Sequence, residues 1–113
     1  MKRISLSTHV LDTARGRPVE SCPVVLERRE GDAWVAVGIG RTDIDGRIPE
    51  LIPDGDAAPG GRYRVTFDLE STPTVADGWY PEVSIVVNLA DGSGHSHVPL
   101  LLAPFGFSTY RGS

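Results

Sequence analysis

Short runs in which apolar and polar residues alternate recur along the chain, and this period of two predicts β-strands. Residues 3–10 alternate in this way, and residues 62–69 and 82–89 do so with Val, Ile, Leu, Phe and Tyr at the apolar positions. No ten-residue window has the apolar spacing of an amphipathic helix. The predicted strands span residues 3–10, 22–29, 34–42, 47–51, 62–69, 82–89, 95–102 and 108–113.

Glycine and proline separate these runs. The chain has 13 Gly and 9 Pro, and the turn-forming pair Asp45-Gly46 falls between two predicted strands. The connection at residues 71–78 has room for one short helical turn. Evenly spaced short strands are typical of an all-β sandwich, so we predict two sheets with about eight strands, mostly antiparallel. No linker divides the sequence, and residues 1–113 are expected to form a single domain.

Composition and charge narrow the class of partner. The 113 residues include 11 Lys and Arg against 15 Asp and Glu, a net charge of -4, which argues against nucleic acid or an anionic membrane as the main partner. The longest apolar run, residues 98–107, is too short to cross a bilayer. The N-terminal residues carry no secretory signal pattern, so we expect a cytoplasmic protein. The lone cysteine, Cys22, is expected to be a small buried hydrophobe.

Few residues offer chemistry, and the common catalytic motifs are missing. His95 and His97 lie two apart on one predicted strand and therefore share a face. With His9 they could bind a metal ion, or they could be ordinary polar residues of a sheet face. Arg47 follows the Asp45-Gly46 turn and is, taken alone, a surface arginine. The aromatic and hydroxyl-rich end of the chain, residues 105–113, predicts a packed C-terminus that is either a docked strand or part of a site.

Taken together, several segments resemble the 5-hydroxyisourate hydrolases, the transthyretin-like enzymes of urate breakdown. The segments are Leu6–Thr13, Gly16–Pro18, Arg41–Arg47, Tyr80–Val83, His97–Leu102 and Ser108–Ser113. The terminal Tyr-Arg-Gly-Ser is the most specific of them, and the transthyretin hormone carriers share the fold but lack that ending and the histidines. The resemblance implies a transthyretin-like (prealbumin-like) sandwich of eight strands with one short helix before Tyr80. It also implies a homotetramer, a dimer of dimers, with active sites in a channel between dimers.

The resemblance also implies the site residues. The catalytic positions map onto His9, Arg47, His97 and Ser113, and substrate binding onto these four with Tyr110, Arg111 and Gly112. No cofactor and no metal ion are expected. Ser96, Ala103 and Phe107 stand where the family more often has an aromatic residue, a serine and a tyrosine.

The implied reaction is the hydrolysis of 5-hydroxyisourate to 2-oxo-4-hydroxy-4-carboxy-5-ureidoimidazoline, by attack of water on the six-membered ring. His9 is the candidate general base or water ligand, and Arg47 would stabilise the developing negative charge. His97 would orient the water or accept a proton, and Ser113 offers a hydroxyl and a carboxylate. Two other functions stay open at this point: a transthyretin-type small-molecule binding module without catalysis, and a non-catalytic interaction domain.

Overall fold

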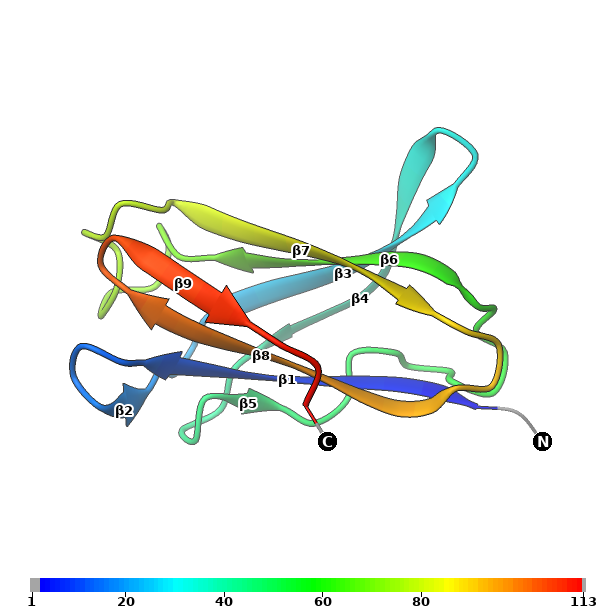
Figure 1. Cartoon of the computed structure of the whole chain (residues 1–113), viewed down its shortest axis with the longest axis horizontal. Coiled ribbons are helices and arrows are strands. Elements are labelled where there is room, and N and C mark those ends of the chain that lie inside the picture. The colour runs from blue at the N-terminus through cyan, green and yellow to red at the C-terminus, as the bar shows by residue number, and fades with distance from the viewer. Residues whose placement is uncertain (1–2, 113) are drawn as a thin grey trace.

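The computed structural model describes residues 3–112, which form nine strands in two stacked sheets (Figure 1). The strands are β1 (Ile4–Asp12), β2 (Arg17–Pro18), β3 (Pro23–Glu30), β4 (Ala33–Arg41), β5 (Arg47–Ile48), β6 (Gly61–Asp68), β7 (Glu82–Leu89), β8 (Gly94–Ala103) and β9 (Gly106–Thr109). The predicted all-β, two-sheet sandwich is confirmed, and the strands match the alternating runs of the sequence closely.

The first sheet has the order β2-β1-β8-β9, and β5 pairs with the same edge of β1 as β2 does. Its centre is a parallel pairing of β1 with β8, which joins the beginning of the chain to a strand near its end. The register places Ser5 opposite His95 and Ser7 opposite His97. Because paired residues of parallel strands point to the same side, these four side chains share the outer face of the sheet.

The second sheet has the order β4-β3-β6-β7 and is antiparallel throughout. A tight hairpin joins β3 to β4, whereas β4 and β5 intervene in the chain between the neighbours β3 and β6. One irregularity between Leu26 and Glu27 shifts the register of β3 against β4. Within residues 3–112, strands β7 and β9 each have a neighbour on one side only, so both sheets end in an open strand at the same side of the sandwich (Figure 1).

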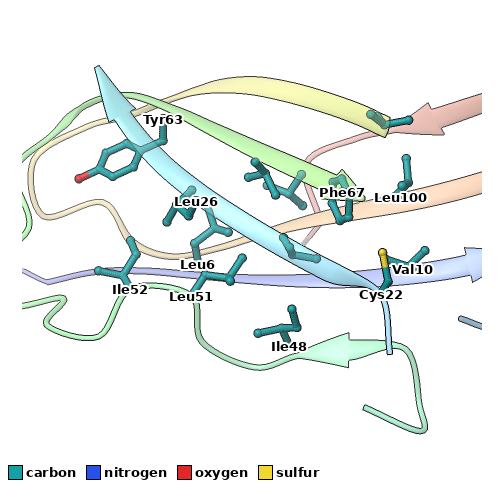
Figure 2. Packing of buried hydrophobic residues seen from close by; sticks show 14 of the residues in the cluster. Leu6, Val10, Cys22, Leu26, Ile48, Leu51, Ile52, Tyr63, Phe67 and Leu100 are labelled. Atoms are coloured by element: carbon teal, nitrogen blue, oxygen red, sulfur yellow. The ribbon is translucent and has the colours of Figure 1, made fainter. Parts of the chain in front are cut away.

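The core lies between the two sheets and is built from the apolar positions of the alternating runs (Figure 2). Tyr63, Val65 and Phe67 of β6 are fully buried, as are Leu6 and Val10 of β1. The phenol of Tyr63 donates a hydrogen bond to the Pro59 carbonyl at 2.6 Å, which satisfies its only polar atom. Cys22 is buried with its thiol free, and the prediction of a small buried hydrophobe is confirmed.

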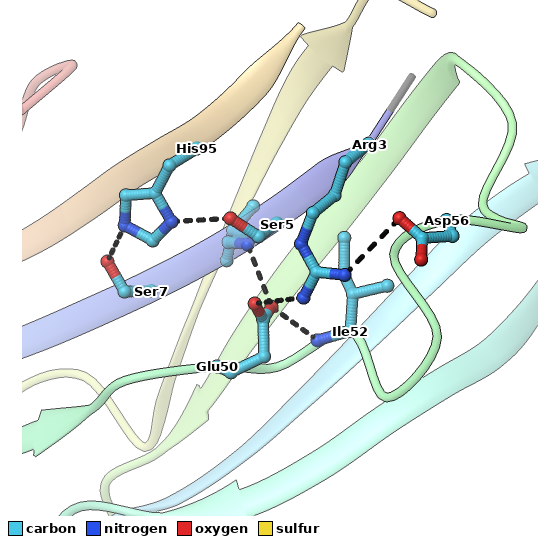
Figure 3. A network of polar contacts seen from close by, with 8 residues as sticks. Arg3, Ser5, Ser7, Glu50, Ile52, Asp56 and His95 are labelled. Carbon is cyan, nitrogen blue, oxygen red and sulfur yellow. Dashed lines mark hydrogen bonds and ion pairs between the residues drawn. The ribbon is translucent and has the colours of Figure 1, made fainter. Parts of the chain in front are cut away.

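The edge of β1 opposite β8 is covered by the chain that follows β5. The Glu50 carboxylate accepts hydrogen bonds from the amides of Leu6 and Ile52, both at 3.0 Å, and lies 3.7 Å from Arg3 (Figure 3). The Leu51 amide donates to the Leu6 carbonyl at 2.8 Å. With neighbours on both edges, β1 is a firm support for the side chains that project from its outer face.

The expected short helix is wrong for the described residues. Residues 71–78 form separate turns, in which the amides of Thr72, Val75 and Gly78 each bond to the carbonyl three residues earlier. These bonds do not overlap, so no continuous run of helical hydrogen bonds forms. The sequence also did not indicate β2, and the last strand is Gly106–Thr109 rather than 108–113. Within residues 3–112, no helix is long and apolar enough to cross a membrane.

Candidate active site

Three of the predicted site residues meet on the outer face of the first sheet. His9 on β1 pairs with Arg47 on β5, and His97 lies on the neighbouring strand β8. His9, Ser7 and Ser5 follow one another at every second position of β1, so they project from the same face as His97. The structure thus brings together residues that lie far apart in the sequence.

The turn before Arg47 fixes its position. The Asp43 carboxylate accepts hydrogen bonds from the amides of Asp45 at 2.9 Å and Arg47 at 3.0 Å. Gly46 has φ of 76°, and a β-carbon there would lie 2.5 Å from the Val10 carbonyl oxygen. Only glycine allows this left-handed turn to approach β1 so closely.

The same turn orients His9. Its Nε2 lies 2.8 Å from the backbone carbonyl oxygen of Asp45. A carbonyl oxygen only accepts hydrogen bonds, so Nε2 carries the hydrogen and the lone pair of the neutral ring is on Nδ1. His9 therefore presents a proton-accepting nitrogen.

The Arg47 side chain is exposed. Among residues 3–112, no carboxylate lies within ion-pair distance of its guanidinium. A guanidinium in this setting can stabilise an anion through its planar set of donors.

His97 belongs to a row of alternating hydroxyl and imidazole groups. Ser5 Oγ lies 2.6 Å from His95 Nδ1, Ser7 Oγ lies 2.9 Å from His95 Nε2, and Ser7 Oγ lies 2.7 Å from His97 Nδ1. Figure 3 shows Ser5 and Ser7 of β1 reaching the two nitrogens of His95. We call these four residues the Ser-His row.

The surroundings of His97 disfavour its protonated form. Burial lowers the pKa of His97 below its ordinary value of 6.5, and His9, His95 and Arg47 lower it further because a second positive charge beside them is unfavourable. Contact with Ser7 acts in the opposite direction. The neutral imidazole is therefore the favoured form at neutral pH.

The C-terminal segment passes directly over His97. The Gly112 amide donates a hydrogen bond to the His97 carbonyl at 2.8 Å, and the two residues form an isolated antiparallel bridge. A β-carbon at position 112 would lie 2.5 Å from Cδ2 of the His97 ring. The glycine of the terminal motif thus permits the chain to touch the imidazole.

The other residues of the terminal motif lie beside this contact. Tyr110 and Arg111 line a groove of about 430 Å³ between β7 and the uncovered half of β8, with His97 in its wall. The structure thus places both residues in the same groove as His97. Ser113 lies outside the described residues.

The arrangement can bind a flat anionic or carbonyl-bearing ligand and move protons near it. It contains Arg47, the imidazoles of His9 and His97 with their hydrogen bonds, and the backbone at Gly112 against the His97 ring. Among residues 3–112, no group of three His, Cys, Asp or Glu side chains is placed to hold a metal ion. In particular, both ring nitrogens of His95 are occupied by serine hydroxyls.

Two kinds of supporting residue escaped the sequence interpretation. Ser5 and Ser7 were expected only as polar positions of an alternating strand, and Asp43 was given no role of its own. The hydroxyls could be linked to the histidines only through the β1–β8 register, which joins residues 90 positions apart. Asp43 gave a usable signal, because an Asp two residues before Asp45-Gly46 is a common acceptor for turn amides.

Fold and site together define a transthyretin-like sandwich that carries a His-Arg site on one sheet face. A model of the HIUase/Transthyretin family matches residues 6–112 of the chain. The 5-hydroxyisourate hydrolase of Salmonella dublin is 43% identical over 112 residues, which cover 96% of this chain and 80% of that protein. The chain therefore belongs to the HIUase/Transthyretin family.

Solved structures agree on the fold. The 5-hydroxyisourate hydrolase of Klebsiella pneumoniae has a TM-score of 0.82 and 34% identity, covering 96% of this chain and 98% of that one. Transthyretin from Sparus aurata has a TM-score of 0.85 and 30% identity, covering 95% of each chain. Because hydrolase and transthyretin fit almost equally well, backbone similarity does not distinguish catalysis from binding, and the side chains of the site must do so.

Proposed function

We propose that the protein is a hydrolase that opens the six-membered ring of 5-hydroxyisourate, a step of urate breakdown. The observation that carries this function is the convergence of His9, Arg47 and His97 on one sheet face, with Gly112 against the His97 ring. A binding module does not need a proton-accepting nitrogen beside a cation, whereas hydrolysis by water does. The high identity to hydrolases over nearly the whole chain supports the same conclusion.

His9 is proposed to activate the water. Its Nδ1 lone pair accepts a proton as the water oxygen bonds to the ring carbonyl carbon. The same proton then passes to the ring nitrogen as the carbon–nitrogen bond breaks. A positioned base of this kind contributes about 10²–10⁴-fold to the rate. His97, neutral for the reasons given above, is proposed to orient the water or to accept a proton from the product.

Arg47 is proposed to stabilise the oxyanion that forms when water adds to the carbonyl. A guanidinium offers only hydrogen-bond donors and no acceptor, so Arg47 cannot act as the base. A charge-assisted hydrogen bond to the oxyanion is stronger than one to the neutral carbonyl, and this difference lowers the barrier. Tyr110 and Arg111 are proposed to hold the substrate in the groove, and Ser113 to supply a hydroxyl to it.

We further propose that the protein assembles as a homotetramer, a dimer of dimers. The open strands β7 and β9 support this, because an unpaired strand edge is a template for pairing with a second copy. Val86, Phe107 and Tyr110 lie on or next to these strands with 51%, 41% and 58% of their surfaces exposed. Size-exclusion chromatography with light scattering should give a mass four times that of the chain, and a monomer would contradict the assembly.

The test of the function follows the ultraviolet absorbance of 5-hydroxyisourate freshly generated from urate. The compound also decays without enzyme, so wild type is compared with buffer, Arg47→Ala and His9→Ala. We expect wild type to accelerate the decay and each variant to lose most of the acceleration. Acceleration that both variants retain would refute the assigned site. Decay at the spontaneous rate with folded wild-type protein would refute hydrolysis and favour a transthyretin-type binding module.

A further inference from the structure

The proposed mechanism uses His97 but leaves Ser5, Ser7 and His95 without a role. We propose that the Ser-His row is a proton-transfer chain, which sets the tautomer of His97 and carries the proton released by hydrolysis from the site to solvent. Ser5, Ser7 and His95 are therefore positioning residues. This inference rests on the proposed hydrolysis for the released proton, and on the structure alone for the tautomer.

The contacts of the row are short and held by the backbone. Its three separations, 2.6, 2.9 and 2.7 Å, are all hydrogen-bond distances. Ser5 and Ser7 are only 7% and 8% exposed, so water has little access to compete for their hydroxyls. Both serines belong to β1, and both histidines to β8, in continuous parallel register.

Proton counting allows two neutral arrangements of the row. In the first, His97 Nδ1–H donates to Ser7, Ser7 donates to His95 Nε2, and His95 Nδ1–H donates to Ser5. His97 Nε2 then carries a lone pair. In the second, every hydrogen bond is reversed, and His97 Nε2 carries a hydrogen. Because a serine hydroxyl has one hydrogen, Ser7 cannot donate to both rings at once, and the two imidazoles are coupled.

Hydrolysis supplies the proton that the row would move. Adding water across the amide bond gives a carboxylic acid and an N–H group, and at neutral pH the acid then loses one proton. His97 Nε2 accepts this proton while its Nδ1 proton passes to Ser7 and the Ser7 proton passes to His95 Nε2. His95 is now an imidazolium. Its Nδ1 proton passes to the Ser5 hydroxyl as that hydroxyl releases its own proton to water, so that Ser5 then donates to Nδ1. Exchange of protons with water restores the first arrangement.

The direction of transfer follows from the charges around the two rings. His97 is partly buried and lies near Arg47 and His9, which face it from β5 and β1. These groups and burial lower the pKa of His97, so a proton is poorly held there. The His95 ring is exposed and lies two residues before His97 on β8, further from His9 and Arg47. A transient charge on His95 is therefore better solvated than a charge on His97.

The first test is spectroscopic and independent of activity. The chain contains only 3 His, so ¹⁵N-histidine labelling gives few ring signals, which His95→Gln helps to assign. We expect the Ser7→Ala substitution to change the tautomer and pKa of His97, and Ser7→Thr, which keeps a hydroxyl, to restore the wild-type spectrum. Ring nitrogen shifts of His97 that are the same in wild type and Ser7→Ala would overturn the proposed control of the tautomer.

The second test is kinetic. Ser7→Ala should lower kcat about 10-fold with KM changed less than about twofold, because proton transfer and not binding is impaired. Ser7→Thr should recover kcat, and the solvent deuterium isotope effect should differ between wild type and Ser7→Ala. Thr66→Ala is the matched control, since it removes a hydroxyl bonded to Ser84 at 2.9 Å on the other sheet.

The outcomes separate the two proposals. An unchanged kcat and isotope effect in folded Ser7→Ala, with activity still lost in Arg47→Ala, would overturn proton export and leave the hydrolase intact. If wild type did not hydrolyse the substrate, the proposed function and the export step would both fail. The ring spectra would then still decide whether the row sets the tautomer of His97.

Discussion

A single methyl group added at position 112 would collide with the His97 imidazole. The Gly112→Ala substitution should therefore displace the terminal segment or turn the ring, and lower kcat/KM by about 10–100-fold. The midpoint of thermal unfolding should change little, because residue 112 forms only one backbone bridge outside the core. Steady-state kinetics and calorimetry on the same preparations check this. Full activity in Gly112→Ala would show that the close contact is dispensable.

The lowered pKa of His97 makes both activity and stability depend on pH. Burial is the main cause, followed by the nearby His9, His95 and Arg47. In the unfolded chain the imidazole binds a proton near pH 6.5, while in the folded protein it does so only at lower pH. Stability should therefore decrease as pH falls from about 6.5 towards the folded pKa, and be fully present above pH ~6.5.

Two measurements test this behaviour of His97. A titration followed by NMR should place its midpoint below that of a free histidine, and Arg47→Ala should move the midpoint upward. Urea unfolding at about pH 5 and pH 7 should give a smaller stability difference for His97→Gln than for wild type. A wild-type midpoint at or above 6.5 would contradict the surroundings described for His97.

At the scale of elements, the turn at residues 43–47 joins His9, the proposed base, to Arg47. Asp43→Ala removes the acceptor of two amide hydrogen bonds. We expect a loss of about 1–2 kcal/mol in stability and about a tenfold lower kcat/KM, because both His9 and Arg47 are held by this turn. Asp43→Asn retains an acceptor oxygen and should behave nearly as wild type. Equal losses in Asp43→Ala and Asp43→Asn would show that the turn depends on the negative charge of Asp43 and not on its acceptor oxygen.

The elements differ in how far the sequence predicts them. Strands β1, β6 and β7 follow from local alternation, since one face of each must be buried in the core. The helix at residues 71–78 did not form because the local turns satisfy the amides separately. The two-residue strand β2 depends on tertiary pairing with β1, and its own sequence carries no strand pattern.

The site residues also divide into those that the sequence predicts and those that depend on tertiary structure. His9, Arg47, His97 and Gly112 were predicted through resemblance to a family, and the structure joins them. The roles of Ser5, Ser7 and Asp43 depend on register and turn geometry. The pairing of β1 with β8 is set by burial of both strands in the core, so no local pattern of residues specifies that Ser7 lies opposite His97.

For the whole molecule, the open strands predict how it associates. Val86 on β7 is 51% exposed in the single chain, so replacing it should not disturb the core. We expect Val86→Lys to shift the protein towards smaller species in light scattering at low concentration, because like charges would meet if β7 strands of two copies pair. Its unfolding free energy as an isolated chain should be within about 0.5 kcal/mol of wild type. An unchanged mass of the Val86→Lys assembly would show that the copies do not associate through this part of β7.

The parallel pairing of β1 with β8 also has a consequence for the order in which the molecule is made. The strands of the second sheet are all synthesised before β8 leaves the ribosome, and their neighbours are joined by antiparallel pairings. The first sheet cannot close until β8 arrives beside β1, a pairing of high contact order that forms slowly. The sheet face that carries the proposed site is therefore completed only after β8 has been synthesised. A nascent chain that stops before β8 holds His9 and Arg47 but lacks His97 and the parallel partner of β1.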